Sequence, residues 1–178
     1  MSCHYREVIE LVLVNGLPGS GKTTLATGLA AVLGAPLISK DAIKVAVAEV
    51  VSAVPGPALG MAASEMRWTL AAAMSGIVVL ESWWFTPRDL GFVEAGLRRC
   101  GPASVVEVWC DVPARVAKAR FAARQRHRIH DDRRQLADAW PRWETAAEPL
   151  GVGPVVYVDT SGAVDVVDVA RRIAKART

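Results

Sequence analysis

The feature that most constrains the fold is the octapeptide at residues 16–23, Gly-Leu-Pro-Gly-Ser-Gly-Lys-Thr, which matches the pattern G-x-x-x-x-G-K-[ST] in full. It follows an apolar run at residues 8–14 that has the composition of a buried strand. It precedes residues 22–33, whose apolar spacing predicts a helix that ends at Gly34. This order turns successive backbone N–H groups toward one point, where the helix dipole adds positive charge. The segment therefore predicts a loop that binds phosphate.

The rest of the chain repeats the alternation of short apolar runs and helical segments. Further strands are predicted at residues 37–39, 77–80, 104–109 and 155–158. Further helices are predicted at residues 41–51 and 58–75, from 86 and 113 onward, and up to about 176. Asp41 would open its helix as an N-terminal cap, and the Pro55-Gly56-Pro57 loop would end that helix. Strands separated by helices favour right-handed β-α-β units and a parallel sheet covered on both faces.

Composition narrows the class of protein. With 52% hydrophobic and 22% charged residues, the 178-residue chain fits one compact domain spanning residues 1–178 and excludes a disordered tail. The strongly apolar stretch at residues 70–80 is shorter than the roughly 20 residues of a membrane span, and residues 1–10 lack the order of a secretion signal. We therefore expect a cytoplasmic protein with no membrane partner. The three cysteines show no CxxC spacing, so neither a disulfide framework nor a zinc cluster is indicated.

Two motifs carry a resemblance to a known family. Together with the segment Ile-Ser-Lys-Asp-Ala-Ile-Lys at residues 38–44, the glycine-rich loop makes the chain resemble the small P-loop kinases, the group that contains polynucleotide kinase domains, chloramphenicol phosphotransferase and zeta-toxin-like kinases. The resemblance runs nearly end to end. It implies the P-loop NTPase fold, an α/β/α sandwich of three layers with a five-stranded parallel sheet and a small helical lid at about residues 121–135. ATP and Mg²⁺ are the cofactors it implies.

The resemblance also assigns roles to residues. Lys22 would hold the β- and γ-phosphates and the Thr23 hydroxyl would ligate magnesium. Asp41 would receive the proton of the acceptor hydroxyl, although a helix cap alone could explain an Asp there. Lys44 matches a basic acceptor-binding position, and an exposed helix lysine is the alternative. The residues expected to bind the nucleotide phosphates are Gly16, Pro18, Gly19, Ser20, Gly21, Lys22, Thr23 and Thr24.

Glu81 and the aromatic turn Trp83, Trp84 and Phe85 follow the third predicted strand. Glu81 stands where a Walker-B-like carboxylate would, so a contact with magnesium, its bound water or the acceptor is implied, although related kinases commonly have Asp. The three aromatic side chains could stack on a ring-bearing acceptor, while core packing explains at least one of them. Polynucleotide kinases favour a small polar turn here. The turn therefore favours a small-molecule acceptor over a nucleic acid.

Eight Arg or Lys residues lie between residues 115 and 134. A solvated helix face would account for them, but the resemblance implies that Arg120 lies against adenine and that Arg124 points toward the phosphates. Arg126 and Arg128 continue into the lid, where guanidinium groups suit a developing phosphoryl charge. Ser161 belongs to the turn at residues 159–162, which related kinases place beside adenine, although a Gly-containing turn explains it equally well. Arg124 and Arg128 are thus candidate catalytic residues beside Asp41 and Lys22.

Three functions fit these observations. The first is an ATP-dependent kinase that phosphorylates a hydroxyl of a small molecule, such as an antibiotic or a nucleoside-like metabolite. The second is a polynucleotide 5′-hydroxyl kinase, which Asp41, Lys44 and the basic cluster favour. The third is a switch or binding module that hydrolyses ATP and has no acceptor. The sequence leaves the acceptor and the oligomeric state open.

Overall fold

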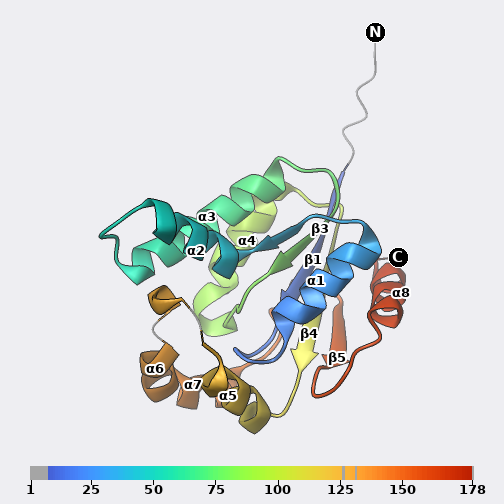
Figure 1. Ribbon diagram of the computed structural model, residues 1–178. Helices are drawn as coiled ribbons and strands as arrows, with labels where there is room; N and C mark the ends of the chain where they lie inside the picture. The colour runs from blue at the N-terminus through green and yellow to red at the C-terminus, as the bar shows by residue number, and fades with distance from the viewer. Residues whose placement is uncertain (1–7, 126, 131, 178) are drawn as a thin grey trace.

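The computed structural model describes residues 8–125, 127–130 and 132–177. Five parallel strands form one sheet in the order β2-β3-β1-β4-β5, so β1 lies at its centre between β3 and β4 (Figure 1). This arrangement confirms the predicted α/β fold of the P-loop NTPase type. The strands are β1 (Ile9–Asn15), β2 (Leu37–Ser39), β3 (Gly76–Glu81), β4 (Ser104–Asp111) and β5 (Val155–Asp159).

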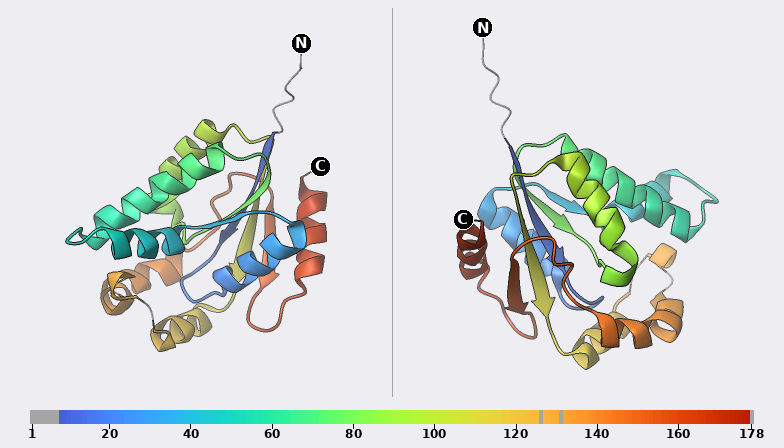
Figure 2. Two further views of the ribbon diagram at one scale, coloured as in Figure 1. Left: turned by 45° about the horizontal axis from the view of Figure 1, so that its top comes forward. Right: turned by 180° about the vertical axis from the view of Figure 1, so that it is seen from behind.

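Helices cover both faces of the sheet, which gives the three layers expected (Figure 2). Helices α1 and α8 pack on one face, α3 and α4 pack on the other, and α2 lies against α3. Within the described ranges, no helix is both long enough and apolar enough to cross a membrane. The principal helices are α1 (Lys22–Leu33), α2 (Lys40–Val50), α3 (Gly56–Ala72), α4 (Thr86–Cys100), α5 (Ala114–Ala123), α7 (Trp140–Ala146) and α8 (Val166–Ala176).

The core follows the alternation of side chains along the central strand. Val12 and Val14 of β1 point to the α1–α8 layer, whereas Leu11 and Leu13 point to the α3–α4 layer. A third apolar cluster lies under α5 and α7, at the end of the sheet where β1 runs into the glycine-rich loop. Because all strands are parallel, their carboxyl ends share one edge, and the polar residues that follow them meet there.

Two predicted helix starts were wrong, and the segment after α5 is more broken than a single helix. Helix α3 begins at Gly56, since Pro57 lies in its first turn, where a missing N–H costs no hydrogen bond. Helix α2 begins at Lys40 with Ser39 as its cap residue, so Asp41 is a first-turn residue and not the cap. The segment after α5 is broken into a 3-10 turn (Arg128–His130), the one-turn helix α6 (Asp132–Arg134) and a π-helix (Gln135–Ala139) before α7.

Candidate active site

The glycine-rich loop curls tightly between β1 and α1. Gly19 has a φ of +86° and Gly21 a φ of +88°, values that side chains other than glycine rarely tolerate. A Cβ atom at Gly19 would also lie 2.2 Å from the carbonyl oxygen of Ala117 in α5. Helix α5 therefore presses directly on the loop, and glycine is required at this position for both backbone conformation and space.

Lys22, the first residue of α1, is buried and points along the loop. Its Nζ donates a 2.8 Å hydrogen bond to the carbonyl oxygen of Leu17. Burial lowers the pKa of Lys22, while the nearby carboxylate of Glu81 acts in the opposite direction. The ammonium is thus held over the loop by a single backbone carbonyl, which a phosphate oxygen could replace at little cost.

Glu81 brings together the residues predicted to ligate a metal ion. It ends β3, which pairs directly with β1, and its side chain is buried. Its Oε1 accepts a 3.4 Å hydrogen bond from the Thr23 hydroxyl, and its Oε2 accepts a 2.6 Å hydrogen bond from the Ser39 hydroxyl. This set of oxygen donors beside a phosphate-binding loop fits the preference of Mg²⁺ for hard oxygen ligands.

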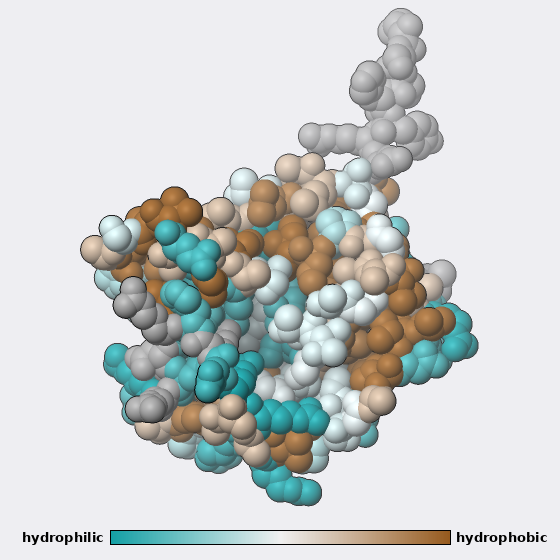
Figure 3. Space-filling model, viewed as in Figure 1, coloured by the Kyte–Doolittle hydropathy of each residue, from teal (hydrophilic) through white to brown (hydrophobic). Residues whose placement is uncertain are grey.

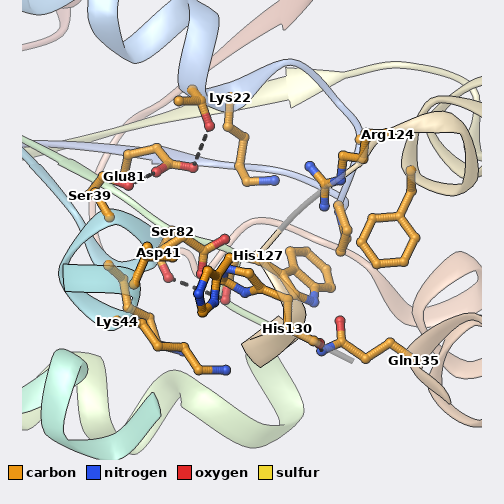
Figure 4. Close-up of a pocket in the computed structure, with 18 of the residues that line it drawn as sticks. Lys22, Ser39, Asp41, Lys44, Glu81, Ser82, Arg124, His127, His130 and Gln135 are labelled. Atoms are coloured by element: carbon orange, nitrogen blue, oxygen red, sulfur yellow. Dashed lines mark hydrogen bonds between the residues drawn. The ribbon is translucent and has the colours of Figure 1, made fainter. Parts of the chain in front are cut away.

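A cavity of about 990 Å³ extends from the loop across to α2. Figure 4 shows Lys22 and Glu81 on one side of this space and Asp41 and Lys44 of α2 on another. Polar residues gather where the hollow opens between the α2–α3 pair and the α5–α6 segment (Figure 3). Many of the predicted site residues line it: Pro18, Gly19, Gly21, Lys22, Thr23, Thr24, Asp41, Lys44, Glu81, Trp83, Arg120 and Arg124.

Some predicted phosphate- and base-binding residues lie outside this lining. Gly16 and the buried Ser20 lie deeper in the loop, and a Cβ at Gly16 would come within 2.8 Å of the Cys110 carbonyl oxygen. Ser161 does not line the cavity, but its carbonyl oxygen accepts a 2.6 Å hydrogen bond from Arg120 Nη2. Arg120 Nη1 bonds the Thr160 carbonyl oxygen at 2.9 Å. Arg120 therefore holds the turn at residues 159–162 in place, and its contact with adenine stays a prediction.

Of the three aromatic residues proposed to stack on an acceptor, two pack in the core, where at least one was expected, so the acceptor-binding prediction was wrong for Trp84 and Phe85. Trp84 is 2% exposed and packs in the core beneath α3 and α4, while Phe85 is buried in the cluster under α5 and α7. Only Trp83 of the three lines the large cavity. There its ring meets that of Trp143 edge to face, with centroids 5.8 Å apart. The aromatic wall of the cavity is therefore built by Trp83 and Trp143 from distant segments of the chain.

The predicted lid segment forms the rim of the cavity opposite the loop. Phe121, Arg124, His127, His130 and Gln135 line the cavity from this side. Lys44 Nζ donates a 3.1 Å hydrogen bond to the Ile129 carbonyl oxygen, which ties α2 to the segment across the cavity. The Arg128 side chain and all of Arg126 lie outside what the structure describes. Closure of this segment over a ligand stays a prediction.

A buried polar network behind the loop went unnoticed in the sequence. Asn15 ends β1; its Nδ2 donates to the Trp84 carbonyl oxygen at 3.2 Å and to Glu107 Oε1 at 3.0 Å. Its Oδ1 accepts from the backbone N–H groups of Gly16 and Trp84 at 2.8 and 3.0 Å. Burial raises the pKa of Glu107, whose carboxylate also accepts from the N–H groups of Leu150 and Gly151. The signal for this network was Asn15, a polar residue that follows the apolar run at residues 11–14 of β1.

Arg67 is a second residue that sequence reasoning missed. It is 1% exposed, on the buried face of α3. Its guanidinium carbon lies 5.1 Å from the Trp68 ring centroid and 4.8 Å from that of Trp84. Leu59, Ala63 and Arg67 follow one another at four-residue spacing, so the arginine stands on the apolar stripe of its helix. This four-residue spacing was the signal in the sequence from which the burial of Arg67 could have been predicted.

Comparison with known proteins identifies the family. A family model described as "AAA domain" matches residues 11–150, which is most of the chain. The chain belongs to the AAA domain family. Its match covers the glycine-rich loop, α2, Glu81 and the rim segment, so the site of this AAA domain is a P-loop nucleotide-binding site. No curated protein matches the sequence.

Solved structures share the fold of this AAA domain at low sequence identity. A candidate kinase from Chloroflexus aurantiacus J-10-fl is 21% identical with a TM-score of 0.77, and the match covers 96% of this chain and 100% of that one. A gluconokinase from Sinorhizobium meliloti 1021 is 19% identical with a TM-score of 0.61, covering 96% and 93%. A shikimate kinase from Acinetobacter baumannii in complex with shikimate is 15% identical with a TM-score of 0.56, covering 95% and 93%.

Proposed function

We propose that the protein is an ATP-dependent phosphotransferase that moves the γ-phosphate to a hydroxyl of a small molecule. The observation that carries the proposal is that Asp41 lines the same cavity as the P-loop, from a separate helix. A carboxylate in the first turn also stabilises its helix, but its position across the cavity from the P-loop is the one that a base for an acceptor hydroxyl requires. Kinases of gluconate and shikimate are among the proteins that share the fold, which agrees with this reading.

The residues divide the chemistry between them. The loop N–H groups and Lys22 bind the β- and γ-phosphates, and the Asp41 carboxylate accepts the proton of the acceptor hydroxyl. The oxygen of that hydroxyl forms a bond to the γ-phosphorus as the bond to ADP breaks. Arg124 lines the cavity near enough to Lys22 to offset negative charge on the transferred group. Thr23 and Glu81 would hold Mg²⁺, which neutralises phosphate charge when it is bound.

The cavity supports a small acceptor with a flat face. Its volume of about 990 Å³ must hold part of the nucleotide as well as the acceptor. The Lys44–Ile129 hydrogen bond spans it on the α2 side, which leaves little room for a polymer. Trp83 and Trp143 offer apolar ring surface on which a nucleoside-like or antibiotic ring could stack.

A transfer screen tests the proposal. The protein is incubated with Mg²⁺ and ATP labelled at the γ-phosphate, together with sugars, sugar acids, nucleosides, antibiotics or 5′-hydroxyl oligonucleotides. We expect label on one class of small hydroxyl compound. Label on oligonucleotides alone would identify a polynucleotide kinase, and release of phosphate to water in every reaction would identify a hydrolase or switch. Either result would reject the proposal.

The two tryptophans of the turn should respond differently to truncation. Trp84→Ala should lower the free energy of unfolding by about 3–5 kcal/mol, since it removes a buried ring and one of the faces that cover Arg67. Trp83→Ala should cost less stability but raise the acceptor KM by about 2–10-fold, the worth of one ring contact. Urea denaturation followed by circular dichroism and steady-state kinetics measure the two effects. The reverse pattern would mean that Trp84 contacts the acceptor.

A further inference from the structure

Lys40 is the cation of the cavity wall for which the phosphotransfer scheme has no role. It is the first residue of α2, beside Asp41, and its half-buried side chain lines the cavity. The other two lysines of the cavity bind backbone carbonyl oxygens, Lys22 that of Leu17 and Lys44 that of Ile129. Lys40, by contrast, forms no hydrogen bond or ion pair within the described part of the chain. Its ammonium is therefore available to a ligand.

Two further cations, Arg67 and Arg88, lie near Lys40. The Arg67 Nη2 donates to Ser64 Oγ at 3.1 Å, while its buried Nε and Nη1 have no hydrogen-bond partner among the residues that the structure describes. Arg88 also lines the cavity, but Asp89 neutralises it with two hydrogen bonds of 2.7 and 2.6 Å. Two carboxylates, those of Asp41 and Asp89, act on both Lys40 and Arg67. Glu81 and Glu65 act on Arg67 as well, but Glu81 accepts hydrogen bonds from Thr23 and Ser39, and Glu65 pairs with Arg99. In our scheme, Asp41 is reserved for the acceptor hydroxyl.

The charges around Lys40 agree with a site that has room for an anion. Burial lowers the pKa of Lys40; Asp41 opposes this effect, and Arg67 and Arg88 add to it. Burial also lowers the pKa of Arg67 to about 10, which leaves it charged at neutral pH. Glu49 lines the cavity from the same helix, but it lies nine residues beyond Lys40, about 13 Å along the axis. A half-buried cation that no hydrogen bond or ion pair of the described residues satisfies costs free energy, which a bound anion would return.

We propose that the acceptor carries an anionic group, a carboxylate or a phosphate, and that Lys40 binds this group while Arg67 supplies a buried positive charge behind it. The inference rests on the proposed kinase function, since it concerns the acceptor half of that site. Lys40 and Asp41 are adjacent on the first turn of α2, so the anionic group and the reacting hydroxyl would be held by neighbouring side chains. Lys40 then orients the hydroxyl toward Asp41 and selects against neutral compounds.

Matched pairs of ligands test this selection. Calorimetric titrations with Mg²⁺ and a non-hydrolysable ATP analogue present would compare gluconate and glucose 6-phosphate with glucose, and shikimate with its methyl ester. The first member of each pair is anionic, and gluconate and glucose 6-phosphate separate a carboxylate from a phosphate. The proteins are wild type, Lys40→Met, Lys40→Arg and Lys118→Met. Lys118 is exposed on α5 and does not line the cavity, so it controls for the lost charge.

The wild-type protein should bind at least one anionic compound about tenfold or more tightly than its neutral counterpart, the range of a charge-assisted hydrogen bond. Lys40→Met should abolish this preference with an unchanged melting temperature and unchanged affinity for the ATP analogue. Lys40→Arg should keep much of the preference, and Lys118→Met all of it. The inference is overturned if neutral compounds bind as well as anionic ones, if no anionic compound binds, or if Lys40→Met retains the preference.

The failure of this inference and the failure of the kinase proposal give different results. Phosphate transfer to neutral acceptors alone would reject the anionic subsite and leave the kinase function standing. Anion binding that depends on Lys40, without transfer to any acceptor, would reject the kinase function and leave the subsite standing.

Discussion

Replacement of Lys22 by methionine is expected to lower kcat/KM for phosphate transfer by about 10²–10³-fold, the usual cost of removing one preorganised donor from a transferring group. The ammonium is buried over the loop, where the phosphates would bind, and its hydrogen bond goes to a single backbone carbonyl oxygen. The affinity for ATP should fall with it, because the lysine binds the phosphates in the ground state as well. Equilibrium titration with a fluorescent ATP analogue and steady-state kinetics measure the two losses.

The matched control for this change is Lys118→Met, which removes the same charge from an exposed position outside the cavity. It should leave nucleotide affinity and turnover within about twofold of wild type, as surface substitutions usually do. Circular dichroism of Lys22→Met should show a folded protein. If Lys22→Met binds and consumes ATP as wild type does, the loop is not the nucleotide site, and every function proposed on it falls.

The second large effect is expected from Asp41→Asn. The amide keeps the size of the side chain but cannot accept the hydroxyl proton, so the rate of transfer should fall by about 10²–10⁴-fold. Affinity for the ATP analogue should change little, because Asp41 approaches the cavity from α2 and not from the loop. Slow hydrolysis of ATP without an acceptor should continue. The selective loss of transfer would separate a kinase from a nucleotide-dependent switch.

Asp168→Asn serves as the control for this variant, since Asp168 is a partly exposed α8 residue paired with Arg171, outside the cavity lining. Product formation with each variant is followed by the label transferred from the γ-phosphate, and ADP release is followed in parallel. Unaltered transfer by Asp41→Asn would remove this carboxylate from the chemistry. The search for a base would then move to the histidines of the rim, His127 and His130, which line the same cavity.

The sequence predicted the fold where local signals were strong. Helix α1 and strand β2 occupy the residues predicted. Gly21 and Gly34 flank α1 in left-handed conformations, and β2 is a three-residue strand between Pro36 and the start of α2. The meeting of Thr23, Asp41 and Glu81 at one cavity also followed from the sequence, because parallel strands place their carboxyl ends on one edge. Periodicity and topology carry this information without knowledge of packing.

The sequence could not show which of the polar and aromatic residues at that edge face the cavity. Trp83 and Trp84 are identical neighbours, yet one lines the cavity and the other fills the core, since only the packing of α3 and α4 decides between them. Trp143 joins Trp83 from 60 residues away, a contact with no local signal. Lys40 was passed over because a charged residue at a helix start is ordinary in solvent. That no hydrogen bond or ion pair of the described residues engages Lys40 appears only in the folded structure.

The Asn15 network fixes the backbone of the aromatic turn independently of the side chain at residue 83. The Asn15 side chain forms hydrogen bonds with the backbone N–H and the carbonyl oxygen of residue 84. The same side chain accepts from the backbone N–H of Gly16, the first glycine of the loop. The Asn15 side chain thus bonds only backbone atoms of the aromatic turn and none of its side chains. Substitutions at residue 83, which lines the cavity, can therefore change specificity while the turn keeps its distance from the P-loop. For directed evolution, this separates position 83, which is open to randomisation, from Asn15, Glu107 and the core residues Trp84 and Phe85, which should be left unaltered.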